Sequence, residues 1–311
     1  MHIPRILVVG DAMLDRYWEG DVDGLAPEAP VPVLRVTRRF ERAGGAANVA
    51  ANLAALGAAV SLVALVGDDA DGERLAGRMD AAGVAFDRVV DPAWSTIVKI
   101  RCLSKAGPLL RADFETPPPP AMRRCLAERF ARALPVHDVV VLSDYAKGAL
   151  DDCASLVRAA VATGRPVLVD PKGADWARYA GATLVKPDLA ALRAVLGGDA
   201  DLDALEERAT ALRLMHGWRH LLVTQAEHGM TLFDDAGVTH EPARVREAGE
   251  VRDVTGAGDT VLAVLAWRLA EGDGAAQAVR WASVAAGLAV RAVGNVVVSR
   301  DDLVDAWEAR G

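Results

Sequence analysis

The chain has 311 residues, carries a net charge of −8 at pH 7 and is 52% hydrophobic. This length suits one large α/β domain, and an acidic balance without a basic run argues against a nucleic-acid partner. No uninterrupted apolar run approaches the ~20 residues that a membrane span needs. We therefore expect a single domain over residues 1–311, with neither nucleic acid nor a membrane as a partner.

The amino-terminal residues and the cysteines bear on the cellular compartment. The first residues enter a strand directly and lack a signal-peptide pattern. The three cysteines, Cys102, Cys125 and Cys153, are odd in number and far apart in the chain, which favours reduced thiols. Both features predict a cytoplasmic protein.

Residues 5–10 form a short apolar run, which is typical of a buried parallel strand. Asp11 and Asp15 follow it, and ligands in open α/β sheets bind just past the carboxyl ends of strands. Asp15 can accept hydrogen bonds from the hydroxyl groups of a sugar. The alternative is a solvated loop acid.

Two regions of the amino-terminal half have the pattern of a small separate sheet. The proline-punctuated, partly alternating residues 27–36 suit an edge strand, and two extended runs at 96–103 and 109–115 predict a hairpin. Between these regions, Gly44 and Gly45 precede a helix that we expect to end near Leu56. Paired glycines at that position permit close approach of the backbone to a ligand.

From residue 134 onward, predicted strands alternate with predicted helices. We expect strands at 138–143, 166–169, 183–185 and 219–224, and helices at about 150–163, 188–197 and 201–216. Each strand ends in polar residues, so the chemistry of the site should gather along one edge of the sheet. The predicted fold is therefore α/β: a doubly wound, mainly parallel sheet with helices on both faces.

Residues 253–260, Asp-Val-Thr-Gly-Ala-Gly-Asp-Thr, follow a polar turn at 247–250 and precede a strongly apolar helix. Gly256 and Gly258 allow the backbone to approach a ligand, and the first turn of a helix offers unpaired amides to an anion. Asp259 beside such an anion could act as a base in phosphoryl transfer to a hydroxyl group. The alternative is an ordinary helix entry in which the helix dipole favours an acid.

This stretch resembles the carboxyl-terminal signature of the ribokinase-like (PfkB) carbohydrate kinases. The resemblance implies a ribokinase-like fold and an ATP-dependent carbohydrate kinase. Asp259 would be the base, and the amides of Gly256, Ala257 and Gly258 would form the anion hole. It also implies a β-sheet lid, formed by residues of about 16–40 and 94–115, through which we expect a homodimer.

Six further stretches, at 10–18, 27–33, 44–50, 111–115, 143–148 and 170–173, resemble one branch of this family. That branch phosphorylates the anomeric hydroxyl of D-glycero-β-D-manno-heptose 7-phosphate for lipopolysaccharide heptose biosynthesis, often as one half of a fusion with a nucleotidyltransferase. The resemblance covers nearly the whole chain, as the kinase half only. It assigns the sugar hydroxyls to Asp15, Gly44, Gly45 and Asn48.

Candidate cations for the substrate's phosphate come from the lysine distribution. Only five of the 35 basic residues are lysines, and all five lie between residues 99 and 186. A sugar phosphate entering an acidic protein needs local positive charge. Lys99, Arg101 and Lys147 are the candidates.

The resemblance also assigns the second substrate and the metals. ATP, with Mg²⁺ bridging its phosphates, would lie along a nucleotide-binding set made of Lys186, Asp188, Thr224, Gly229 and Ser283. Asp253 and Thr255 resemble part of the family's loop for a monovalent cation, K⁺.

Three departures from the family pattern leave alternatives open. Asp188-Leu189-Ala190-Ala191 stands where the family has Asn-x-x-Glu, Ser283 replaces an asparagine near the adenine, and Gly294-Asn295 replaces Gly-Thr. A kinase for another heptose or hexose phosphate is one alternative. A non-catalytic regulator that binds a sugar or nucleotide is the other.

Overall fold

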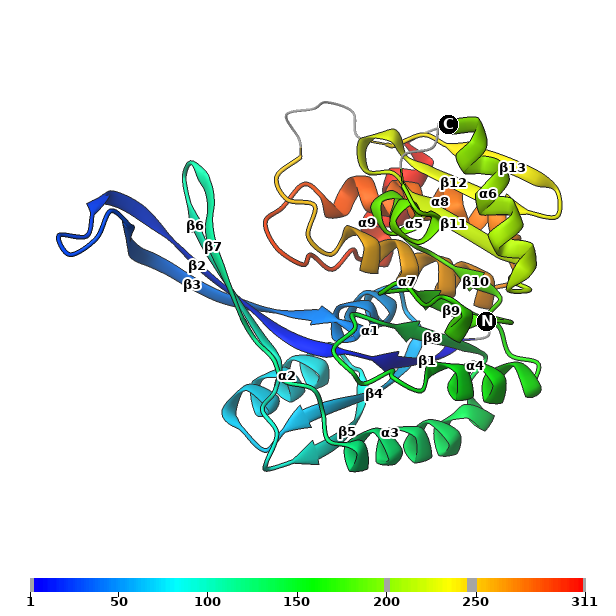
Figure 1. Ribbon diagram of the computed structural model, residues 1–311, viewed down its shortest axis with the longest axis horizontal. Helices are drawn as coiled ribbons and strands as arrows, with labels where there is room; N and C mark the ends of the chain where they lie inside the picture. Colours follow the sequence, from blue (N-terminus) through cyan, green and yellow to red (C-terminus); the bar gives the residue numbers. More distant parts are fainter. Residues whose placement is uncertain (1–2, 199–201, 245–250, 310–311) are drawn as a thin grey trace.

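The computed structural model describes residues 3–198, 202–244 and 251–309, which form two sheets of very different size (Figure 1). The strands of the large sheet are β1 (Arg5–Gly10), β4 (Ala59–Gly67), β5 (Ala85–Asp91), β8 (Val139–Ser143), β9 (Val167–Asp170), β10 (Leu184–Val185), β11 (His220–Thr224), β12 (Met230–Asp234) and β13 (Gly237–Glu241). Their order is β13-β12-β11-β10-β9-β8-β1-β4-β5, and all neighbours are parallel except at β11–β12–β13.

Helices cover both faces of this sheet. They are α1 (Ala46–Ala55), α2 (Ala70–Ala81), α3 (Pro120–Ala133), α4 (Cys153–Ala162), α5 (Leu189–Leu196), α6 (Leu202–Met215), α7 (Ala257–Ala270), α8 (Ala275–Ala289) and α9 (Arg300–Glu308). Along β1, Ile6 and Val8 pack with α1, α2, α7, α8 and α9, whereas Leu7 and Val9 pack with α3, α4, α5 and α6. Alternating side chains of one strand thus fill two cores. The predicted doubly wound fold is confirmed.

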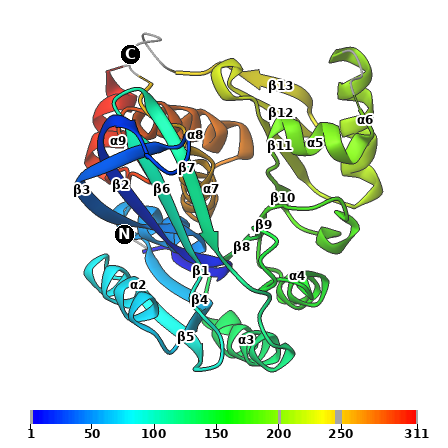
Figure 2. The same cartoon turned by 60° about the vertical axis from the view of Figure 1, so that its left-hand side comes forward.

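The small sheet is the lid, made of β2 (Ala12–Leu25), β3 (Pro32–Gly45), β6 (Val98–Ser104) and β7 (Gly107–Phe114) in the order β3-β2-β6-β7. In Figure 1 its strands project from the body of the molecule, and in the turned view of Figure 2 they come forward and cross in front of α7 and α9. The predicted hairpin at 96–115 is confirmed as β6–β7. The lid strands begin closer to the core than we expected, since β2 starts at Ala12 and β3 runs into α1 at Gly45. Asp15 therefore lies in a lid strand and is not a loop acid.

Several elements were not predicted from the sequence: β5 at the sheet edge, the antiparallel strands β12 and β13, and the helices α8 and α9. The polar turn expected at 247–250 lies outside the described residues. Within the described ranges, no helix combines the length and hydrophobicity required to cross a bilayer.

Candidate active site

The entry to α7 is built on Gly256, whose φ of +79° lies in the left-handed region that favours glycine. A Cβ there would lie 2.7 Å from Asn295 Oδ1 and 2.9 Å from Asn48 Nδ2, so no larger residue fits without movement. Ala257 N–H donates to the carbonyl oxygen of Val254 at a long 3.3 Å. The amides of Gly258 and Asp259 belong to the first turn, where no intrahelical acceptor exists. They are the donors best placed to meet an anion.

Asp259 is buried at this helix entry, with a hydrogen bond to each carboxylate oxygen. Tyr145 Oη donates to Oδ1 at 2.7 Å, and Asn48 Nδ2 donates to Oδ2 at 2.8 Å. Burial raises the pKa of Asp259 to about 7; these two hydrogen bonds oppose the rise, and the nearby Asp170 carboxylate adds to it. A carboxylate with a pKa near neutrality is well matched to accept a proton from a hydroxyl group.

Asp15 lies 3% exposed in β2 and keeps one carboxylate oxygen open. Its Oδ2 accepts a hydrogen bond from Asn295 Nδ2 at 2.6 Å, whereas its buried Oδ1 has no partner among the described residues. Burial raises the pKa of Asp15, and the Arg101 guanidinium opposes that rise. Because an orphaned buried acceptor is costly, Oδ1 is a natural acceptor for a ligand hydroxyl.

The paired glycines lie where the lid meets α1. A Cβ at Gly44 would lie 2.6 Å from Asp15 Oδ2, and Gly45 has a φ of +57° that favours glycine. The Gly44 backbone thus packs directly against Asp15, whereas Gly45 packs against the carbonyl oxygen of Asp11. Asn48, three residues on, contacts Asp259 rather than Asp15, and Asn52 supports it by donating to its carbonyl oxygen at 3.0 Å. The sugar-binding candidates are therefore brought together around both carboxylates.

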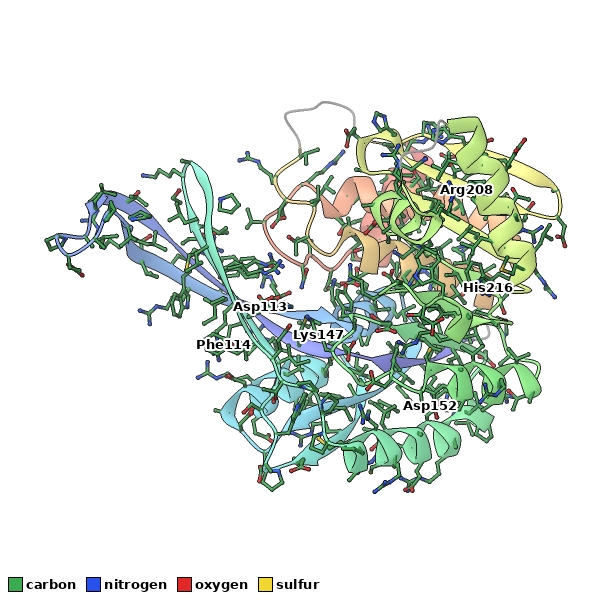
Figure 3. All side chains as sticks on the ribbon, in the orientation of Figure 1. Asp113, Phe114, Lys147, Asp152, Arg208 and His216 are labelled. Carbon is green, nitrogen blue, oxygen red and sulfur yellow. The ribbon has the colours of Figure 1, made fainter. Side chains whose placement is uncertain are left out.

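The two lysines proposed for the substrate's phosphate are already paired with carboxylates. Lys99 Nζ contacts Asp113 at 2.8 Å and Glu115 at 3.2 Å, and Lys147 Nζ contacts Glu115 at 2.6 Å. Figure 3 labels Asp113 and Lys147, which lie where the lid joins the body. Arg101 differs from both, because its buried Nε has no hydrogen-bond partner within the part of the chain that the structure describes.

Lys186 lies directly over the first turn of α7. Its ammonium group is 2.9 Å from Asp170 Oδ2, and a Cβ at Gly258 would come within 3.4 Å of it. Lys186 is only 3% exposed. The helix amides and this cation therefore face the same position, which suits the charge of a transferring phosphoryl group.

The other nucleotide-binding candidates are engaged in local structure. Asp188 Oδ1 caps α5 by accepting from Ala191 N–H at 2.7 Å, and Thr224 N–H donates to the Pro187 carbonyl oxygen at 3.0 Å. The Ser283 hydroxyl donates to the Pro242 carbonyl oxygen at 3.0 Å. Gly229 has a φ of +92°, and a Cβ there would overlap the Glu241 backbone.

Asp253 organises the loop that leads to α7. Its Oδ1 accepts from Thr255 N–H at 2.9 Å and from Thr255 Oγ1 at 2.7 Å, and its Oδ2 accepts from Gly294 N–H at 2.9 Å. No group of three or more His, Cys, Asp or Glu side chains within the described ranges could hold a metal. A monovalent cation at this loop would depend largely on backbone carbonyl oxygens.

Two residues of the site were not assigned a role from the sequence. Tyr145 lies within the quoted stretch 143–148, but spacing alone does not reveal its hydrogen bond to a residue 114 positions away. Asn295 was noted only as a departure from the family pattern, yet it donates to Asp15 and to the carbonyl oxygen of Ala43 at 2.7 Å. The replacement of the family's threonine by Asn295 was the one signal in the sequence that pointed to this residue.

Solved structures with the same architecture define the class of fold. A putative ribokinase from Agrobacterium tumefaciens superposes with a TM-score of 0.80 at 20% identity, covering 99% of both chains. Phosphofructokinase-2 from Escherichia coli in complex with potassium gives a TM-score of 0.81 at 21% identity, with the same coverage. The chain thus has the ribokinase-like fold.

Sequence similarity then identifies the family. The model of the pfkB family carbohydrate kinases matches residues 4–300. The chain is 52% identical over 299 residues to the D-beta-D-heptose 7-phosphate kinase of Bordetella bronchiseptica, covering 96% of this chain and 95% of that protein. It is 46% identical over 306 residues to the bifunctional protein HldE of Hydrogenovibrio crunogenus, of which it spans 63%. The chain belongs to the pfkB family of carbohydrate kinases, which are phosphotransferases that use ATP with Mg²⁺.

Proposed function

We propose that this chain phosphorylates the anomeric hydroxyl of D-glycero-β-D-manno-heptose 7-phosphate at the expense of ATP. The observation that carries the chemistry is the Asp259 carboxylate, whose pKa burial raises to about 7, beside the first-turn amides of α7 and the Lys186 ammonium. The choice of sugar rests on the 52% identity to the Bordetella bronchiseptica kinase over nearly the full length of both chains.

In the proposed reaction, Asp15 Oδ1 accepts a hydrogen bond from a sugar hydroxyl. Gly44 and Gly45 allow the backbone to approach the sugar closely. Asp259 accepts the proton of the attacking hydroxyl as its oxygen bonds to the γ-phosphorus, and the bond from that phosphorus to the bridging oxygen of ADP breaks. Tyr145 and Asn48 hold the carboxylate in orientation.

The transferring phosphoryl group would lie against the amides of Gly258 and Asp259. Gly256 provides the left-handed turn that exposes them, and Ala257 begins the helix. Lys186 supplies the adjacent positive charge. Charge stabilisation by pre-positioned donors of this kind is the main contribution a protein makes to phosphoryl transfer.

ATP would extend from Lys186 along Asp188, Thr224 and Gly229 toward Ser283, with Mg²⁺ carried on its phosphates. The side chains of Asp188, Thr224 and Ser283 form hydrogen bonds within the protein. Beyond Lys186, the nucleotide would therefore be bound mainly by backbone groups and by the shape of the surface. Potassium is a proposed activator at the loop of Asp253 and Thr255. Initial rates in K⁺, compared with Na⁺ at equal ionic strength, test that part.

We further propose a homodimer through the lid. Four large hydrophobic residues near its tip are between 40% and 64% exposed: Val22, Leu25, Val31 and Val33. A second lid would remove this apolar surface from water. A sedimentation experiment on the wild type and on a variant with Leu25→Asp and Val33→Asp tests the proposal, with a monomeric variant as the expected outcome.

The function is tested by ATP consumption across a panel of sugar phosphates and free sugars. We expect heptose 7-phosphate to exceed unphosphorylated sugars by at least ~10²-fold in kcat/KM, because one charge-assisted phosphate contact contributes ~3 kcal/mol. A preference for another heptose or hexose phosphate would change the substrate but keep the class of reaction. Binding of sugar or nucleotide without turnover would instead favour a regulator, in keeping with the missing Asn-x-x-Glu pattern.

A further inference from the structure

One face of the lid is turned toward the candidate active site, and the strand register shows which residues lie on that face. Asp15 pairs laterally with Arg42 on β3 and with Lys99 on β6, which in turn pairs with Asp113 on β7. The next row along the strands contains Phe40, Tyr17, Arg101 and Arg111. Residues directly paired across strands share a face. We call this the inner face of the lid, because its Asp15 is bonded to Asn295.

Most cations of the inner face are already paired with carboxylates. Lys99 contacts Asp113 and Glu115, and Arg111 Nε contacts Asp113 Oδ1 at 3.0 Å. One row further out, Arg38 contacts Glu19 at 3.2 Å. Lys147, which approaches from the body of the molecule, contacts Glu115. An incoming phosphate would have to compete with a carboxylate for each of these groups.

Arg42 and Arg101 are different, since neither forms an ion pair with a carboxylate of the described residues within 4.0 Å. The Arg42 guanidinium lies 5.3 Å from the centre of the Phe40 ring, and that ring stacks on Tyr17 at 4.7 Å. Arg101 Nε is buried, and residues 3–198, 202–244 and 251–309 offer it no hydrogen-bond partner. Two arginines of the inner face therefore have donors available for an anion.

These two arginines flank Asp15 from opposite sides. Arg42 is its direct neighbour on β3, and Arg101 lies one row further out on β6. Neighbouring strands are ~4.8 Å apart and one row adds ~6.7 Å along the strand, so the two backbone positions are separated by ~12 Å, a distance that two arginine side chains can bridge around one phosphate. Asn295 joins Asp15 to the turn at Gly256, beyond which lies Asp259. A sugar held by Asp15 thus has the reacting carboxylate on one side and the two arginines on the other.

We propose that Arg42 and Arg101 together bind the phosphate that the sugar already carries, and so determine selectivity for a sugar phosphate. Lys99 and Lys147 instead hold the base of the lid through Glu115. This inference rests on the proposed function, because it requires a substrate that is phosphorylated at the end remote from the attacking hydroxyl. Guanidinium groups suit this role since they bind phosphate oxygens in a bidentate geometry.

The test compares Arg42→Met and Arg101→Met with a matched control, Arg111→Met, which removes an arginine of the same face that already has a carboxylate partner. We measure kcat/KM for heptose 7-phosphate and for the unphosphorylated heptose, with ATP saturating. The selectivity ratio should fall about 10- to 100-fold in each of the first two variants, as expected for loss of one charge-assisted contact, and should stay unchanged in the control. Turnover of the free heptose should fall less than turnover of heptose 7-phosphate in both variants, because only the phosphorylated sugar loses a contact to its phosphate.

The outcomes separate this proposal from the proposed function. If the wild type prefers a different sugar phosphate, the assigned sugar is wrong, and the same variants are measured with that substrate. If the wild type uses heptose 7-phosphate and both variants retain its full selectivity, only the arginine proposal is overturned. Wild-type preference for an unphosphorylated sugar overturns both.

Two further measurements guard against a folding defect. Arg42→Lys and Arg101→Lys keep the charge but lose the planar fork, so they should recover part of the lost selectivity. Calorimetric titration of heptose 7-phosphate without ATP should show weaker binding in both methionine variants and unchanged binding in Arg111→Met. Equal binding in all three variants would contradict the proposal.

Discussion

The two ends of the candidate site are built in different ways. At the sugar end, buried side chains point their polar atoms at one another across the chain: Asp15 meets Asn295, and Asp259 meets Asn48 and Tyr145. At the nucleotide end, Asp188 caps a helix and Ser283 bonds to a backbone carbonyl group. The proposed sugar end is a network of side chains with one acceptor left open among the described residues, whereas at the proposed nucleotide end Asp188 and Ser283 serve local structure and Lys186 supplies the charge.

The difference indicates where substitutions should affect chemistry and where they should affect only local structure. A buried carboxylate with an open oxygen or a raised pKa is costly to fold, so it is retained for what it does with a ligand. A helix-capping side chain stabilises the fold by itself, because it accepts a hydrogen bond from an otherwise unpaired backbone amide. We therefore expect large functional effects at the sugar end and small ones at Asp188.

The largest effect is expected at Asp259. Asp259→Asn keeps the size of the side chain but turns one of its two acceptor oxygens into a donor, and the amide cannot accept the proton, so kcat should fall by ~10²–10⁴. Sugar affinity, measured by calorimetry, should stay nearly unchanged. Loss of sugar binding with preserved turnover would reverse the assignment of roles between Asp259 and Asp15.

The next effect is expected at Asp15, the other buried carboxylate of the sugar end. Asp15→Asn replaces the open Oδ1 acceptor with a weaker acceptor or with a donor, according to how the amide is oriented. Because a hydroxyl would be held equally in the ground state and the transition state, KM should rise by ~10–10² while kcat changes little. Steady-state kinetics with varied sugar phosphate measure both constants. A fall confined to kcat would instead place Asp15 in the chemical step.

The residues that could be predicted from the sequence are those whose local backbone or position in the chain marks them. The glycine-rich turn at 253–260 and the paired glycines at 44–45 were recognisable because a left-handed or closely packed backbone demands glycine. Asp15 and Asp259 were recognisable from their positions after a strand and at a helix entry. The predicted β-strands and helices of the doubly wound core were confirmed because their apolar periodicity is strong.

What the sequence did not reveal depends on contacts between distant parts of the chain. The hydrogen bond of Asn295 to Asp15 joins residues 280 positions apart, and no local pattern encodes it. The lysine cluster suggested free cations, but the register of β6 and β7 places Asp113 beside Lys99. The strands β12 and β13 lack a distinctive apolar run, so only their pairing in the sheet defines them.

Tyr145 offers a sharper test of the sugar end, through the pH dependence of the reaction. Asp259 must be deprotonated to act as a base, so activity should fall as the pH drops through its pKa of about 7. The Tyr145 hydroxyl stabilises the carboxylate and opposes the rise caused by burial, as do Asn48 and Lys186, whereas Asp170 acts in the other direction. Tyr145→Phe should therefore move the acidic limb of kcat/KM upward by about one pH unit, since a hydrogen bond to a charged group contributes ~1.5 kcal/mol.

The control for this prediction separates electrostatics from packing. Phenylalanine keeps the ring that lies against Gly45 and removes only the hydroxyl group. At a pH well above the limb, the variant should approach wild-type activity. A uniform loss at every pH, with the limb in its original position, would mean that Tyr145 serves packing alone.

The smallest effect is expected at the nucleotide end, where Ala191 stands in place of the family's glutamate. A carboxylate at this position would organise water around Mg²⁺ on the ATP phosphates, so Ala191→Glu should tighten the apparent affinity for Mg²⁺ by up to about tenfold without changing the KM for sugar. Asp188→Asn should leave the Mg²⁺ midpoint unchanged, because asparagine caps a helix as well as aspartate does and the Asp188 carboxylate already accepts from Ala191 N–H. Magnesium titrations of the wild type and both variants at saturating sugar measure these midpoints. A weaker midpoint in Asp188→Asn would show that its charge reaches the metal, and the nucleotide end would then use a side chain where we expect only backbone.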